Sequence, residues 1–222
     1  MDKKNLENQV SILINHYNSR RFAEAVQKGK ILIKKFPNQL IFYNATALSL
    51  SALGKNYEAL RILNLALNLS PKNIHVLNNL GLINSNLNYN KEAREYLNKA
   101  IAVKENFMDA LLNLGNLDLK EGKTKNAKKN LYKALEQSNS PHTDVTINMA
   151  LGNMNQQIGN FKEAKNHYEI VSKIDQLNTA ADKSISTMHK YLNTDDPHLI
   201  LMIKKLKKIK ILYYFLAYVS HE

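Results

Sequence analysis

The side chains best suited to chemistry in this sequence are seven histidines, and none of them forms the HxH or HExxH spacing of a metal site. The one group of histidines and acids comprises His189, Asp195, Asp196 and His198. A metal site there competes with helix capping. We favour capping, because Asp195 or Asp196 before Pro197 is a good N-cap followed by proline at the first helical position. No serine, histidine and acid set has motif context, so we predict no enzyme and no cofactor.

A run of lysines precedes an aromatic segment, residues 213–215, near the C-terminal end. Clustered lysines beside an apolar stretch attract anionic lipid, so a membrane surface is one partner for this segment. Nucleic acid, which the same charges would bind through phosphates, is not expected. We favour a third interpretation, a capping helix whose apolar side covers the preceding repeat. The lysines are Lys204, Lys205, Lys207, Lys208 and Lys210, and the covering side is Leu201, Leu206, Ile209, Leu212 and Phe215.

The composition of the chain indicates which kind of fold positions these residues. The chain has 222 residues, 44% of them hydrophobic, which is typical of a folded protein. It has no cysteine, which excludes disulfides and thiolate metal sites. Only 7 glycines and 4 prolines punctuate it, which favours helices. Residues 1–14 lack a signal-peptide core, and residues 209–219 are about half the length that crosses a bilayer, so we expect a cytoplasmic protein.

An alanine recurs at a constant step through most of the chain. Ala25, Ala59, Ala93 and Ala127 are 34 residues apart, and Ala164 follows after 37. The phrase around each alanine recurs too, as Asn-Tyr-Glu-Ala, Asn-Lys-Glu-Ala and Asn-Phe-Lys-Glu-Ala. A fixed period of this length is the signature of a repeat architecture in which each unit is a pair of helices.

Further landmarks recur at fixed distances from these alanines. Small residues precede them at Ala47, Gly81, Gly115 and Gly152, and apolar ones follow at Leu32, Ala66, Ala100, Ala134 and Val171. Helices cross closely only where side chains are short, so these positions predict helix contacts. Glycines at the turn inside a pair predict left-handed caps, and prolines predict the ends of second helices. These are Gly54, Gly122 and Gly159, and Pro37 and Pro71.

The landmarks resemble those of the tetratricopeptide repeat (TPR) family, over five copies. The resemblance implies an all-α, right-handed superhelix of helix-turn-helix repeats, followed by C-terminal helices that serve as a cap or a truncated linker. We expect a TPR array over residues 1–178 and C-terminal helices over 179–222. The repeats span residues 6–39, 40–73, 74–107, 108–141 and 145–178.

Three local departures carry further expectations. Leu13 takes the place of a glycine or alanine in the first copy, as a terminal repeat tolerates. Glu105 replaces the closing proline of the third copy, so that boundary is a candidate for a longer or continuous helix. Residues 138–141 are the expected place for a kink or an altered stacking angle between the fourth and fifth copies.

More specifically, the array resembles the N-terminal TPR region of bacterial sulfotransferase-type and sugar-transferase-type (O-GlcNAc-transferase-like) proteins. The suggestive stretch runs from Ala181 through His189 to His198. In that group a similar segment leads toward a catalytic domain. The sequence has no Gly-rich phosphate loop, so transferase activity does not carry over.

The resemblance implies a scaffold that binds a peptide or partner segment in a groove lined by the first helices of the pairs. Asparagines before the Leu-Gly landmarks, Asn79 and Asn113, resemble a ladder that grips a peptide backbone in the sugar-transferase relatives. An amide suits this role because it offers both donor and acceptor. Ala45 and Ala150 interrupt the ladder. The alternative is compositional, because asparagine is common throughout the chain.

The full set of groove candidates lies on the expected first helices: Asn44, His75, Asn78, Asn79, Asp109, Leu112, Asn113, Asn116, Lys120, Asn153 and Gln156. A clamp for a terminal carboxylate is not expected, because Lys120 has no matching Lys or Arg on the two preceding first helices. The alternative function is a substrate-positioning region for a sulfotransferase or glycosyltransferase whose catalytic domain is absent from this chain.

Overall fold

The computed structural model describes residues 3–188 and 195–219, with side chains for residues 5–188 and 195–210. All regular structure in these residues is helical, which confirms the all-α prediction. The chain divides into two compact units, Met1–Gln137 and Ser138–Glu222. The division falls at the segment, residues 138–141, where the sequence predicts a change in stacking.

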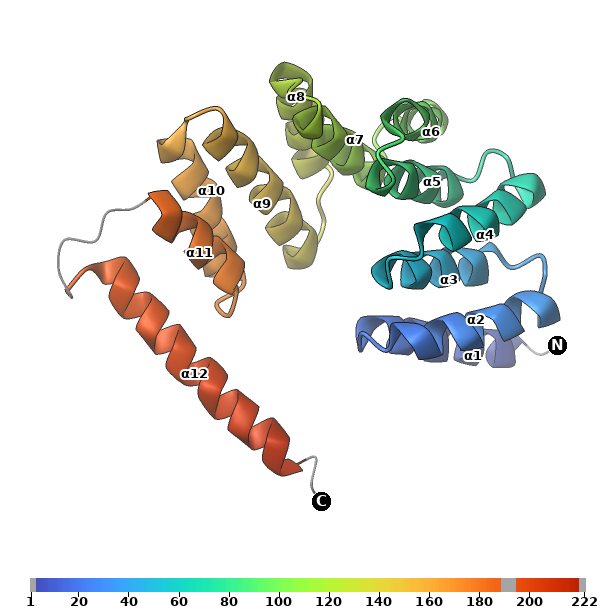
Figure 1. Cartoon of the computed structure of the whole chain (residues 1–222), viewed down its shortest axis with the longest axis horizontal. Helices are drawn as coiled ribbons and strands as arrows, with labels where there is room; N and C mark the ends of the chain where they lie inside the picture. Colours follow the sequence, from blue (N-terminus) through green and yellow to red (C-terminus); the bar gives the residue numbers. More distant parts are fainter. Residues whose placement is uncertain (1–2, 189–194, 220–222) are drawn as a thin grey trace. The chain divides into compact units, whose positions relative to one another are not determined.

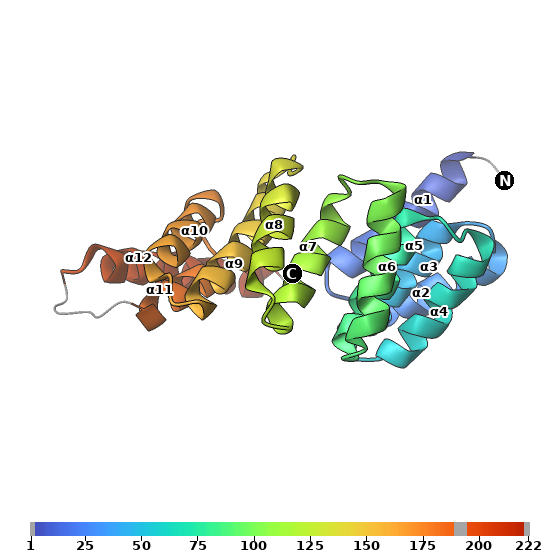
Figure 2. The ribbon, with the colours of Figure 1, turned by 90° about the horizontal axis from the view of Figure 1, so that it is seen from above.

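The first unit contains four antiparallel helix pairs in chain order. Figures 1 and 2 show them running side by side. Their bounds are α1 Lys3–Asn18 and α2 Phe22–Lys35, α3 Leu40–Ala52 and α4 Asn56–Leu69, α5 Ile74–Asn86 and α6 Asn90–Val103, and α7 Met108–Lys120 and α8 Thr124–Glu136. The second unit contains α9 Pro141–Gln157, α10 Phe161–Ile174, α11 Thr179–Met188 and α12 Pro197–Val219.

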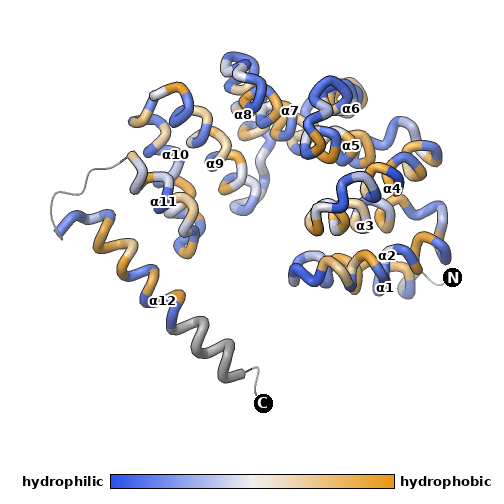
Figure 3. The backbone as a smooth tube through the Cα atoms, in the orientation of Figure 1, coloured by the Kyte–Doolittle hydropathy of each residue, from blue (hydrophilic) through white to orange (hydrophobic). Residues whose placement is uncertain are grey.

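Small residues bring the two helices of each pair together, as the repeat landmarks predict. The five landmark alanines from Ala25 to Ala164 are all fully buried. A β-carbon on Gly81 would lie 2.5 Å from Leu97 Cγ, and one on Gly152 would lie 2.5 Å from Tyr168 Cε1. The glycines are therefore required by close helix packing. Figure 3 shows hydrophobic and hydrophilic segments alternating along each helix, as expected for amphipathic helices.

The first helices form the inner layer of unit 1. Each of α1, α3 and α5 contacts the next first helix, whereas α2, α4 and α6 pack mainly on the first helices of their own pair and of the next pair. Their cores are continuous: Leu13, Ala25 and Phe42 begin a buried cluster that further clusters extend through α7. Leu13, the departure in the first copy, is fully buried.

The boundary at Glu105 is a correction to the sequence analysis. Helix α6 ends at Val103 and α7 begins at Met108, so no continuous helix forms there. Two features end α6 without a proline: Lys104 adopts an extended backbone, and Phe107 is buried against the core. The side chain of Glu105 instead accepts a hydrogen bond from Lys133 Nζ at 2.9 Å.

Helices α11 and α12, predicted as a cap or a truncated linker, occupy the sequence positions of a sixth helix pair. His198 lies 34 residues after the landmark Ala164, and Lys205 lies 34 after Val171. Ser186 Oγ contacts Met202 Sδ at 3.3 Å. Those two residues are 16 apart, the same separation as Gly152 and Tyr168 in the preceding pair.

The face by which α12 packs is not the predicted one. Leu201 and Leu206 are 43% and 58% exposed, whereas Lys205 is 5% exposed and bonds Asp182 of α11. The expected apolar covering side is therefore wrong at these two leucines. Ile209 is half-buried. The side chains of Leu212 and Phe215 lie outside the described residues. None of the described helices has the length and apolarity that a bilayer crossing requires.

Candidate binding surface

Four asparagines predicted for the groove form one hydrogen-bonded chain across α3, α5 and α7. Asn79 Nδ2 donates to Asn44 Oδ1 at 2.9 Å, and Asn113 Nδ2 donates to Asn78 Oδ1 at 2.9 Å. Asn78 Nδ2 donates to Asn79 Oδ1 at 3.3 Å, which joins the two pairs. We call this set the amide chain. Asn78 and Asn79 are buried, and Asn44 and Asn113 are half-buried at its ends.

The repeat explains why these asparagines meet. Each hydrogen bond between neighbouring first helices joins residues that are 35 apart in the sequence. This separation is one residue more than the 34-residue period, so facing positions on successive first helices are offset by one residue. A second line of contacts has the same offset two turns further along. Asn86 Nδ2 donates to Ser51 Oγ at 3.2 Å, and Lys120 Nζ donates to the Ser85 carbonyl at 2.7 Å. Adjacent first helices are thus joined by polar contacts at two levels.

Between these two levels lies a depression of about 440 Å³. Three of the predicted groove residues, Asn113, Asn116 and Lys120, contribute to its wall. Asn116 is exposed, and Lys120 is held at the edge by its bond to Ser85. The remaining lining residues are Gly81, Leu82, Ser85, Asn86 and Leu97.

The other predicted groove residues lie outside the amide chain and the depression. His75 is exposed at the start of α5, and its ring meets that of Phe107 edge-on at 5.2 Å. Asp109 and Leu112 are half-buried on α7. Asn153 and Gln156 belong to the second unit, where Asn153 Oδ1 and Gln156 Oε1 each lie 2.8 Å from the hydroxyl oxygen of Tyr168 and share its one hydrogen. Burial raises the pKa of Tyr168.

An ion-paired cluster in unit 1 was not predicted. Arg94 Nη2 on α6 lies 2.8 Å from Asp118 Oδ1 on α7 and 2.7 Å from Glu121 Oε2. Asn130 Nδ2 on α8 donates to Asp118 Oδ2 at 2.9 Å. Although burial acts to lower the pKa of Arg94, its hydrogen bonds to Asp118 and Glu121 raise that pKa. Hydrogen bonds from Lys123 and Arg94 lower the pKa of Glu121. The cluster is structural, joining three helices.

The predicted anionic-surface cluster loses one member. Lys205 Nζ is buried between α11 and α12, where it lies 3.0 and 2.9 Å from the two carboxylate oxygens of Asp182. It is therefore not available to an external surface, a correction to the sequence analysis. Four lysines remain exposed on α12: Lys204, Lys207, Lys208 and Lys210.

The acidic and histidine group caps a helix. Asp196 Oδ1 accepts from the backbone amides of His198 at 2.9 Å and Leu199 at 3.3 Å, and Pro197 is the first residue of α12. The capping interpretation is confirmed for Asp196. His189 lies outside the described residues. Elsewhere in the described part of the chain, no three His, Asp or Glu side chains are placed to share a metal ion.

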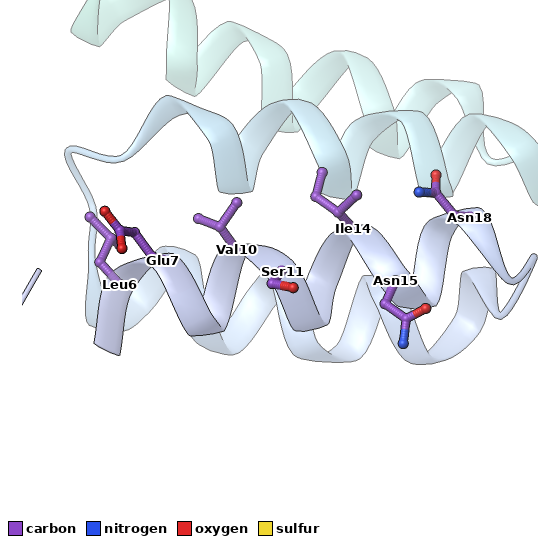
Figure 4. Close-up of a pocket in the computed structure, with 7 residues that line it drawn as sticks. All are labelled: Leu6, Glu7, Val10, Ser11, Ile14, Asn15 and Asn18. Atoms are coloured by element: carbon purple, nitrogen blue, oxygen red, sulfur yellow. The ribbon is translucent and has the colours of Figure 1, made fainter. Parts of the chain in front are cut away.

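The outer face of α1 carries a further shallow surface of about 570 Å³. Figure 4 shows that all seven of its side chains come from this one helix. Leu6, Val10 and Ile14 form its apolar stripe, with Glu7 and Ser11 beside them. A surface lined by a single helix encloses no ligand, so we assign it no site.

Comparison with known families identifies the repeat. Residues 74–107 and 109–141 each match the model of the tetratricopeptide repeat. These are the third and fourth helix pairs, and they carry three of the four asparagines of the amide chain and its depression. A comparison with curated protein sequences gave no match.

Solved structures show the same fold at low sequence identity. A thermophilic TPR protein from Thermus thermophilus superposes with a TM-score of 0.74 at 18% identity, covering 82% of this chain and 97% of that one. The Cut9–Hcn1 hetero-tetramer of APC/C gives a TM-score of 0.76 at 16% identity, covering 90% of this chain but only 39% of that one. YrrB, described as a TPR protein with an unusual peptide-binding site, gives 0.50 at 22% identity, covering 81% and 91%.

These comparisons support the TPR part of the sequence resemblance and the solenoid fold. The closer resemblance to sulfotransferase-type and sugar-transferase-type proteins rests on the sequence alone.

Proposed function

We propose, from the tetratricopeptide fold of this chain, that unit 1 binds an extended peptide segment of a partner protein along α3, α5 and α7. The observation that carries the proposal is the amide chain. It runs across the three inner helices beside a depression to which Asn113, Asn116 and Lys120 contribute. TPR proteins are scaffolds for other proteins, and YrrB is described as having a peptide-binding site.

The amide chain suits a peptide backbone because its side chains have more hydrogen-bond donors and acceptors than the internal links use. A carboxamide has two N–H donors and two acceptor lone pairs, and the three links use only some of them. The half-buried Asn44 and Asn113 at the ends of the amide chain therefore keep capacity for a backbone C=O or N–H of a ligand. Because the internal bonds already fix the side-chain rotamers, less conformational entropy is lost when a ligand binds.

The spacing of the inner helices also suits an extended ligand. Packed helices lie about 8–10 Å apart, and an extended chain rises about 3.3 Å per residue. One first helix therefore corresponds to about three ligand residues. Recognition through the ligand backbone would make the surface tolerant of ligand sequence. The proposal assigns this chain a binding role and includes no catalytic step.

A peptide-array experiment tests the proposal. We expect an Asn79→Ala/Asn113→Ala variant to bind captured peptides at least tenfold more weakly than the wild type, which corresponds to about 1.4 kcal/mol. Because both changes remove donors inside the amide chain, the variant's thermal unfolding must be measured alongside. A second variant, Asn116→Ala/Lys120→Ala, changes exposed side chains at the depression and keeps the amide chain intact.

The matched control is Asn64→Ala/Asn98→Ala, which removes two exposed amides from the second helices α4 and α6. We expect it to bind as the wild type does. Equal binding by the wild type and both groove variants, with all proteins folded, would remove this surface from the account.

A further inference from the structure

A cleft of about 710 Å³ lies within unit 2, between one face of α10 and one face of α12, with α11 at its base. The α10 face contributes residues at helical spacing from Lys165 to Lys173, with Gln176 in the turn after it, and the α12 face contributes residues from Pro197 to Lys208. Asp182 and Ile185 of α11 form the base. This volume is in the range of small-molecule sites. We call it the lysine cleft.

The sequence of the sixth helix pair explains why the cleft is open. In the preceding pair, the landmark positions hold Ala164 and Val171, and α10 packs closely on α9. In the sixth pair the same positions hold His198 and Lys205. Interaxial distance depends on the side chains at the contact, so these longer residues hold α12 away from α11. The space that a closed pair would fill remains as the cleft.

The acidic groups of the cleft are all engaged within the protein. Asp182 contacts Lys205 and accepts from Ser172 Oγ at 3.1 Å, with His198 Nε2 at 3.7 Å. Asp196 caps α12. Glu169 lies 3.8 Å from Lys165 Nζ. Five lysines therefore line the cleft against three carboxylates, and two of those carboxylates, Asp182 and Glu169, already pair with a lysine.

Three further lysines at the cleft have no such partner. Lys173 on α10 and Lys204 and Lys208 on α12 are exposed at the cleft, and in the described part of the chain none of them makes an ion pair. Beside them lie exposed apolar surfaces of Pro197 and Leu201. The cleft thus combines a positive rim from two helices with an apolar patch on α12.

We propose that the lysine cleft binds the phosphomonoester group of a small organic ligand. A phosphomonoester carries a charge of about −1.5 to −2 at pH 7 and three acceptor oxygens, which suits three lysine ammonium groups. Lysine binds phosphate as a point charge, and a phosphomonoester carries more negative charge than a carboxylate, so three lysines favour the phosphomonoester. The organic body of the ligand rests on Pro197 and Leu201.

The test uses the full chain and phenyl phosphate, with binding measured by isothermal titration calorimetry at constant ionic strength. We expect saturable one-to-one binding that a Lys173→Gln/Lys204→Gln/Lys208→Gln variant weakens at least tenfold. The charge-matched control is Lys91→Gln/Lys125→Gln/Lys207→Gln, which lowers the net charge equally with exposed lysines outside the cleft. We expect the control to bind phenyl phosphate as the wild type does. Thermal unfolding establishes that both variants are folded.

A second arm distinguishes a soluble ligand from a lipid headgroup with the same chemistry. Vesicles of phosphatidic acid present a phosphomonoester on a membrane, and co-sedimentation is measured for the same three proteins. Cleft-dependent binding in either arm supports the proposal and identifies the source. Three results overturn it: equal loss in the cleft and control variants, binding of benzoate as tight as that of phenyl phosphate, and no cleft-dependent binding in either arm.

Discussion

At the scale of single residues, the turns inside the first five helix pairs show one backbone requirement met by three residue types. The residues at positions 20, 54, 88, 122 and 159 all have positive φ, between 57° and 78°. Three are glycines, and the others are Arg20 and Asn88. The left-handed region is costly for residues with a β-carbon, although asparagine visits it more readily than most. The three glycines were predicted as left-handed caps, and the structure confirms them.

This position gives a direct prediction for stability. A β-carbon on Gly54 would have no atom within 4 Å, so a Gly54→Ala change alters only backbone strain and chain entropy. We expect it to lower the free energy of unfolding by about 1 kcal/mol. The mirror change Asn88→Gly should alter stability by less than about 0.5 kcal/mol, because relief of strain and added freedom of the unfolded chain oppose each other. Urea unfolding of both variants measures the difference. An Asn88→Gly effect as large as that of Gly54→Ala would contradict this explanation.

The asparagines of the amide chain were predicted as groove residues from the sequence, but their mutual hydrogen bonds were not. Asn79 and Asn113 were predicted from their place before the Leu-Gly landmarks, and Asn44 and Asn78 as neighbours. Their pairing at an offset of 35 could not be predicted, because it depends on how successive first helices rotate against one another. The structure shows that the amides bond to one another. Whether they also bind a ligand remains a prediction.

At the scale of the helix, a buried carboxylate joins three elements of unit 1. Asp118 is fully buried on α7, where it contacts Arg94 of α6 and Asn130 of α8. The sequence contained a signal for it. Asp118 follows Leu111 by seven residues and Leu114 by four, so it lies on the apolar stripe. The signal was missed because a charged side chain is usually assigned to a solvated face.

We expect an Asp118→Asn change to lower the free energy of unfolding by about 2–3 kcal/mol. Removing one partner of a buried pair leaves the other charge uncompensated, and Arg94 keeps only part of its balance through Glu121. The control is Glu95→Gln, whose pair with Lys99 is exposed and should change stability by less than about 1 kcal/mol. Chemical denaturation with both variants is the measurement. Similar losses in the two would show that Asp118 does not join these helices energetically.

Helix positions were largely predictable, and helix faces at the C-terminal end were not. The 34-residue period located the five predicted pairs because small residues must recur wherever two helices cross. For α12 the same period places His198 and Lys205 at the crossing, which composition alone would assign to solvent. Only the partner on α11, Asp182, makes burial of Lys205 favourable, because a buried charge must be paired. That partner lies 23 residues away, so no local pattern in α12 reveals the pairing.

At the scale of the whole molecule, each of the two units has a hydrophobic core of its own. The clusters around Leu13, Leu63 and Leu97 lie in unit 1, and the cluster around Tyr168 lies in unit 2. In a repeat protein each pair contacts only its neighbours, and stability is approximately the sum of the pairs and their interfaces. Unit 1 has four pairs and three interfaces, all built on the repeat landmarks. The proposed peptide surface lies entirely within it, whereas the lysine cleft lies within unit 2.

We therefore expect residues 1–137 to fold as an isolated fragment. Three or more stacked repeats are needed to bury a continuous core, and this fragment retains four. Its circular dichroism should show full helical signal and one cooperative thermal transition, and it should keep the peptide binding proposed for the full chain. The control fragment, residues 74–137, has two pairs and one interface, so it should unfold without a cooperative transition. A fragment 1–137 that is unfolded, or that folds but loses binding, would show that the core or the peptide surface requires unit 2.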